Sequence, residues 1–187
     1  MPDRMLERSL RRMRTEPLQA AALVVAVVGA AAILGAWFFE FVMKLAPCPL
    51  CLEQRIPYYI AIPLALIVLA ATYAKAPRWL LVAALAIVAA AMLWNAGLGI
   101  YHAGIEWKWW PGPQDCSAPI SNLGSAGNLL RQLEDINVVR CDEAAWRFLG
   151  LSLAGWNVVI SLGLAAVALR AVVSARRAAY GSSSVSQ

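Results

Sequence analysis

Charged side chains are scarce in this sequence. Asp, Glu, Lys and Arg make up only 14% of its 187 residues, whereas a soluble domain usually carries about a quarter. Apolar side chains account for 61% of the chain. This balance excludes an ordinary water-soluble domain, so the expected solvent of the protein is a lipid bilayer.

Four long segments contain no charged residue at all. They hold 23, 19, 27 and 22 residues and span 17–39, 56–74, 79–105 and 148–169. Because a helix rises about 1.5 Å per residue and the hydrocarbon core is about 30 Å thick, roughly 20 apolar residues can cross it. The first segment is longer than the core of a cleaved signal peptide, which spans about 7–15 residues, so we predict that it is retained.

The predicted fold class is therefore an all-α membrane protein, built as one four-helix bundle domain over residues 1–187. A soluble helical bundle would show polar residues at helical period, and 61–71 and 80–93 show none. The predicted connections are two longer loops, at 40–55 and 106–147. The predicted tails are 1–16 and 170–187.

The basic residues predict how this bundle is oriented. Ten of them lie in the two tails and the short turn between the second and third spans, and the other six lie in the longer loops with eight acids. Lys and Arg accumulate on the cytoplasmic side of membrane proteins. We therefore expect both termini in the cytoplasm and both longer loops outside. This topology explains the net charge of +5, so we expect no nucleic-acid partner.

All four cysteines fall in the predicted outer loops. Cys48 and Cys51 lie in the first loop, and Cys116 and Cys141 lie in the second. An even number of thiols on the oxidising side of a membrane is typical of disulfides or of redox-active pairs. A structural zinc site is an alternative, although such sites usually have two closely spaced pairs and this chain has one, so we expect no metal. A scaffold whose disulfides merely fasten loops is the third possibility.

The first cysteine pair is flanked by prolines, in the order Pro47-Cys48-Pro49-Leu50-Cys51. Proline cannot continue a preceding helix but is accepted in the first turn of a new one. We therefore predict that Cys48 caps the second helix and that Cys51 lies in its first turn. The positive helix end there lowers the pKa of a cysteine. Arg55 follows on the same face and adds positive charge, unless it is only an interfacial anchor.

The second pair is separated by 24 residues that are rich in turn formers. A disulfide between Cys116 and Cys141 would stabilise the fold by at most ~3.5 kcal/mol through the closed loop. A purely structural bridge is therefore one interpretation of this pair, and a mobile redox-active loop is the other.

These features together resemble the DsbB family of bacterial disulfide bond formation proteins, over about residues 18–173. The resemblance rests on Cys48-Pro49-Leu50-Cys51 with Arg55, on Cys116 and Cys141, and on the stretch 141–151 that leads into the fourth span. It implies a quinone-dependent protein-dithiol oxidoreductase of the bacterial inner membrane, with its cysteines on the periplasmic side.

The resemblance also implies a role for each site residue. Cys116 would form a mixed disulfide with a reduced DsbA-like periplasmic partner, and Cys141 would pass the electrons to Cys48. Cys51 would face the quinone as a thiolate, and Arg55 would hold the quinone head group. The implied cofactor is ubiquinone in preference to menaquinone, with both left open.

His102 and Glu106 are spaced one helical turn apart at the outer end of the third span. They are candidates for quinone binding that could carry protons to the reduced quinone, and interfacial hydrogen bonding is the simpler alternative. Trp107, Trp109 and Trp110 are interpreted as an interfacial aromatic belt rather than as a quinone pocket.

Overall fold

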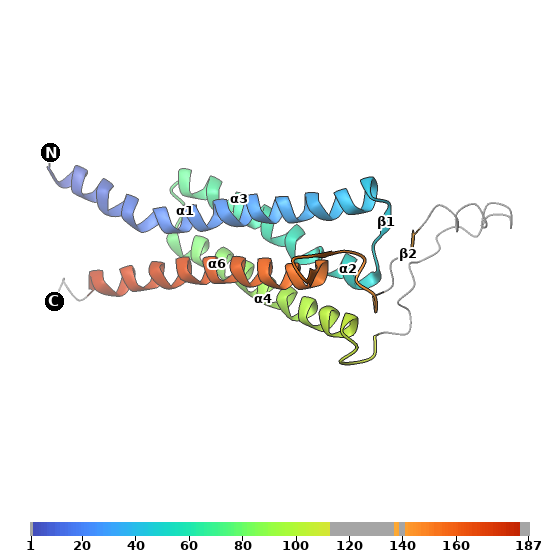
Figure 1. Cartoon of the computed structure of the whole chain (residues 1–187). Helices are drawn as coiled ribbons and strands as arrows, with labels where there is room; N and C mark the ends of the chain where they lie inside the picture. The colour runs from blue at the N-terminus through green and yellow to red at the C-terminus, as the bar shows by residue number, and fades with distance from the viewer. Residues whose placement is uncertain (1, 113–136, 139–140, 184–187) are drawn as a thin grey trace. The chain divides into compact units, whose positions relative to one another are not determined.

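The structure is a computed structural model that describes residues 2–112, 137–138 and 141–183, and it is mostly helical (Figure 1). Its helices are α1 (Pro2–Trp37), the π-helix η1 (Phe38–Val42), α2 (Pro49–Glu53), α3 (Ile56–Tyr73), α4 (Arg78–Glu106) and α6 (Leu153–Ser183). Its short strands are β1 (Leu45–Ala46), β2 (Asn137–Val138), β3 (Arg147–Phe148) and β4 (Leu151–Ser152).

Among the described residues, four helical segments are long and apolar enough to cross a membrane. They are Glu16–Val42, Pro49–Tyr73, Arg78–Glu106 and Leu153–Ala178. Large apolar side chains such as Leu23, Ile67 and Trp94 are more than half exposed, as expected for surfaces that face lipid rather than water. The predicted fold class, a helical membrane protein with four spans, is confirmed. The orientation of the bundle in the membrane stays a prediction.

The chain forms two compact units, and each includes parts of several helices. The first comprises residues 1–30, 58–93 and 161–187. Within it, the start of α1, the turn between α3 and α4 and the end of α6 lie toward the same end (Figure 1). Polar pairs cross this unit. Gln19 donates to Thr72 at 3.0 Å in a partly buried contact, and the Tyr58 hydroxyl lies 3.3 Å from that of Ser161 in a buried one.

The second unit comprises residues 31–57 and 94–160 and holds the described candidate site residues. Strands β1 and β2 pair in parallel, with Leu45 opposite Asn137 and Ala46 opposite Val138. Because two parallel strands run in the same direction, Cys48 and Cys141, which follow β1 and β2 in the sequence, lie beyond the same end of this ladder.

The fourth span differs from its predicted boundary of 148–169. Residues 147–152 form a hairpin of β3 and β4, and α6 begins only at Leu153 and continues to Ser183. Leu149 and Gly150 at the turn have φ of 52° and 83°, a left-handed conformation that no α-helix contains. The absence of charge after Arg147 therefore predicted a span but not the turn that precedes it.

Candidate active site

Cys48 is the N-cap of α2, as predicted. Its backbone is extended, with φ −72° and ψ 164°, and its sulfur accepts a hydrogen bond from the backbone N–H of Cys51 at 3.3 Å. Pro49 occupies the first helical turn, where its missing N–H leaves no backbone hydrogen bond unmade. Pro47 thus follows strand β1, Pro49 starts α2, and both cysteines lie at the N-terminus of this helix.

The two sulfurs of this pair lie 3.0 Å apart and have different surroundings. The Cys48 thiol donates toward the Cys51 sulfur, and Cys48 is completely buried whereas Cys51 is partly exposed. The hydrogen bond to Cys51 and the burial together raise the pKa of Cys48 to about 12. At neutral pH Cys48 therefore keeps its proton in the reduced pair.

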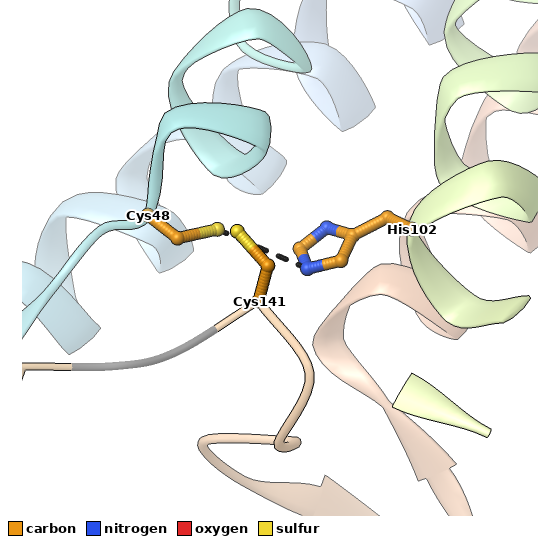
Figure 2. Close-up of side chains that lie close together, drawn as sticks. All are labelled: Cys48, His102 and Cys141. Carbon is orange, nitrogen blue, oxygen red and sulfur yellow. Dashed lines mark hydrogen bonds between the residues drawn. The ribbon is translucent and has the colours of Figure 1, made fainter. Parts of the chain in front are cut away.

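Cys141 brings the second cysteine loop to the same place. Its sulfur, the sulfur of Cys48 and a ring nitrogen of His102 lie within 4.8 Å of one another, and all three residues are buried (Figure 2). Cys48, Cys141, Leu50 and Ile105 form one apolar cluster, against which Cys51 and Trp110 pack. The β1–β2 ladder supplies this proximity. The predicted site residue Cys116 lies outside the described residues.

His102 contacts the first cysteine pair directly. Its Nε2 atom is 3.8 Å from the Cys48 sulfur, and its Nδ1 atom is 2.8 Å from Nε2 of Gln54. Glu106 shares the helical face of His102, as the spacing predicted, with Oε1 at 3.9 Å from the His102 Nε2. The structure thus places His102 beside Cys48 and Glu106 beside His102, and their contact with a quinone stays a prediction.

Arg55 follows α2 and forms an ion pair that the sequence did not reveal. Its guanidinium donates to Oε2 of Glu40, which belongs to η1, and the two side chains are only 12% and 25% exposed. An ion pair of this limited exposure is screened less by water than a surface pair. Arg55 is therefore held in place by a residue 15 positions earlier in the chain.

Two functional candidates were missed entirely from the sequence, Gln54 and Asn157. The Asn157 Nδ2 group donates to Oε1 of Gln54 at 2.6 Å, across 103 positions of sequence. The available signal was the presence of asparagine inside otherwise apolar spans, at Asn95 and Asn157. Polar residues inside membrane spans are costly and therefore mark functional positions.

The three tryptophans at the end of α4 do not behave alike. Trp107 and Trp109 are 45% and 64% exposed, whereas Trp110 turns back onto the helix and packs on the cysteine cluster. The Trp110 indole donates to the carbonyl of Tyr101 at 2.9 Å and stacks on the Tyr101 ring. Lys108 binds the carboxylate and the carbonyl of Asp142 at 2.9 Å, which ties this end of α4 to the residue after Cys141.

Comparison with known proteins identifies one family. A family model described as disulfide bond formation protein DsbB matches residues 18–171. A disulfide bond formation protein B of Xanthomonas oryzae pv. oryzae is 30% identical over 146 residues, which cover 75% of this chain and 81% of the relative. A protein of the same name from Methylococcus capsulatus is 32% identical over 148 residues, with 75% and 85% covered. One from Stutzerimonas stutzeri is 30% identical over 152 residues, with 78% and 90% covered.

The packing of Trp110 depends on a glycine. A Cβ atom added at Gly104 would lie 2.0 Å from the Trp110 ring, so Gly104→Ala should displace the indole from the cysteine cluster. In reduced Gly104→Ala, we expect Cys48 and Cys141 to react with a small alkylating reagent several-fold faster than in the unsubstituted protein, as measured by peptide mass spectrometry. Gly97→Ala on the same helix meets nothing within 4 Å and is the matched control. Equal alkylation rates in the two variants would contradict this role of Trp110.

Proposed function

The chain belongs to the DsbB family of disulfide bond formation proteins, and on that premise we propose that it oxidises a DsbA-like periplasmic dithiol protein and passes the electrons to a membrane quinone. Membership of this family makes it a disulfide-forming oxidoreductase, and its four apolar helices make it a multi-pass membrane protein. The proposed location is the bacterial inner membrane, with both termini in the cytoplasm and the cysteines on the periplasmic side.

The proximity of the Cys141 and Cys48 sulfurs is the observation that carries this proposal. Disulfide exchange requires a thiolate to attack a disulfide sulfur, so the two sulfurs must be able to meet. Sulfurs within 4.8 Å of each other in a buried cluster satisfy this condition after a small movement. A structural bridge between Cys116 and Cys141 alone would give no reason to bury Cys141 against Cys48.

The proposed relay conserves electrons at each exchange. A thiolate of the partner attacks Cys116 in the Cys116–Cys141 disulfide, and Cys141 leaves as a thiolate. The second partner thiolate then closes the partner's disulfide and releases Cys116. The Cys141 thiolate attacks Cys48 in the Cys48–Cys51 disulfide, and Cys51 leaves as a thiolate. Finally, Cys116 attacks Cys141, which restores the outer disulfide and leaves Cys48 and Cys51 with the two electrons.

The surroundings of Cys51 fit a quinone at the membrane edge. Cys51 is the less buried sulfur of the pair and lies at the start of the membrane-spanning segment Pro49–Tyr73. When bound, a quinone would supply an acceptor for two electrons and two protons. Cys51 would approach it as the thiolate, and the Arg55 cation would hold its oxygens where water is scarce. Ubiquinone is proposed in preference to menaquinone.

A zinc protein is the second candidate, because Cys48, Cys141 and His102 offer two sulfurs and a ring nitrogen, which are ligand types that zinc prefers. A structural zinc protein would not transfer electrons from a dithiol to an added quinone. It would instead contain about one equivalent of zinc after purification and lose stability when the metal is chelated. Both measurements can be made on one preparation.

The relay predicts that the purified protein reduces a soluble quinone analogue at the expense of a reduced thioredoxin-fold dithiol protein. Cys116→Ser should abolish this activity, because the outer loop then has no disulfide for the partner to attack. The same variant should still pass electrons from chemically reduced Cys48 and Cys51 to the quinone analogue. A Cys116→Ser protein that oxidises its partner at the normal rate would overturn the proposed order.

The contact between the two loops can be tested by trapping. In the double variant Cys51→Ser, Cys116→Ser, only Cys48 and Cys141 remain, and mild oxidation should join them in a disulfide detected by peptide mass spectrometry. The control is Cys48→Ser, Cys116→Ser, which leaves Cys51 and Cys141. We expect it to form its disulfide much more slowly, and equal rates in both variants would show that Cys141 does not select Cys48.

Arg55 is expected to act on the quinone rather than on folding. Arg55→His should raise the apparent KM for the quinone analogue about tenfold or more, the effect of losing one hydrogen bond from a cation. Arg55→Lys should be milder, because it keeps the charge but lacks the planar fork. Steady-state titrations on variants normalised for folded protein measure this.

The ion pair with Glu40 provides the control for this experiment. If Arg55 only fastens η1 to the segment after α2, Glu40→Gln and Arg55→His should lower the yield of folded protein equally. The surviving protein would then show an unchanged quinone KM in both variants. That result would sink the assignment of Arg55 to the quinone.

A further inference from the structure

A continuous row of polar side chains leads through the second unit to the first cysteine pair. Asn95 donates to Asn157 at 3.2 Å, and Asn157 donates to Gln54 at 2.6 Å. Gln54 lies 2.8 Å from Nδ1 of His102, and Nε2 of His102 lies 3.8 Å from the sulfur of Cys48. Asn95, Gln54 and His102 are 0%, 6% and 4% exposed and Asn157 is partly exposed, so most of the row is shielded from water and lipid.

The hydrogen bonds in this row all have the same direction. Because the Gln54 oxygen accepts from Asn157, its amide nitrogen faces His102 and donates to Nδ1. A neutral histidine whose Nδ1 accepts carries its proton on Nε2. That N–H points toward Cys48, whose own thiol donates toward Cys51. Every donor therefore points toward the two sulfurs.

Such a row has a defined electrostatic effect. Donors aligned toward a sulfur stabilise negative charge on it, and a buried row does so more strongly than one in water. Stabilising the thiolate form of a dithiol makes its disulfide a stronger oxidant. Glu106 Oε1 lies 3.9 Å from the same nitrogen of His102, so that N–H has a carboxylate as a second acceptor. The hydrogen bond from Gln54 to Nδ1 is therefore the contact that holds the His102 ring toward Cys48.

We propose that Gln54, Asn157 and Asn95 are positioning residues that hold His102 with its Nε2–H directed at Cys48, so that the reduced Cys48–Cys51 pair is stabilised. This inference rests on the proposed redox role of that pair. It also moves the role of His102 from proton delivery at the quinone to control of the dithiol. The row acts on the two sulfurs directly, and its effect does not require a bound ligand.

The test is the equilibrium of the Cys48–Cys51 pair with glutathione, in a Cys116→Ser, Cys141→Ser background that leaves only these two cysteines. Gln54→Met keeps the length of the side chain but removes the donor to His102. The midpoint is the ratio of the squared concentration of reduced glutathione to that of oxidised glutathione at which half of the Cys48–Cys51 pair is reduced. We expect Gln54→Met to raise this midpoint about tenfold, the effect of one lost hydrogen bond to a charged group. Asn157→Leu, one step further away, should move it in the same direction by less.

Two controls separate positioning from a general effect on the fold. Gln19→Met removes a similar amide that donates to Thr72 in the first unit, and the midpoint should not change. In a His102→Phe background, Gln54→Met should cause no further shift, because its effect acts through the histidine. An unchanged midpoint in folded Gln54→Met and Asn157→Leu, or a full shift without His102, would overturn the proposal. The measurement needs neither quinone nor partner, so failure of the relay in other assays would not produce either result.

Discussion

The contacts of a single sulfur, that of Cys48, organise the second unit of this protein. In the proposed relay, this one atom must lie near Cys51 to form the inner disulfide and near Cys141 to exchange with the outer loop. The structure meets both demands by interrupting the chain before the second span. Pro49 starts a short helix with Cys48 at its cap, and the strand just before it aligns the segment that carries Cys141. The irregular backbone here is a consequence of bringing distant thiols together.

The two cysteines of the inner pair differ because they face different surroundings. Cys48 lies in a dry cluster, and its raised pKa keeps it protonated in the reduced pair. Cys51 is partly exposed beside the start of the membrane-spanning segment. In the proposed relay, this arrangement gives each sulfur its own exchange partner. Cys48 can meet another protein sulfur inside the cluster, and Cys51 remains accessible to a molecule that arrives from the membrane.

The sequence predicted those features that follow from local chemistry. Lipid requires long apolar helices, so the absence of charge revealed four spans, and proline chemistry placed Cys48 at a helix cap. Features that depend on residues distant in sequence were not predictable. The ion pair of Arg55 with Glu40 and the hydrogen bond from Asn157 to Gln54 arise only once the helices pack. The start of the fourth helix was misplaced because an apolar composition does not reveal a left-handed turn.

The polar groups buried near the cysteines are mostly neutral amides, and this choice has a physical reason. A fixed cation beside Cys48 would stabilise a thiolate strongly, but its burial would cost several kcal/mol without a counterion. A carboxamide carries no net charge, and each one here donates to the next group in the row. A row of dipoles can therefore direct a donor at a sulfur while leaving few polar groups unsatisfied. The Arg55 cation has its own acid partner and lies outside this row.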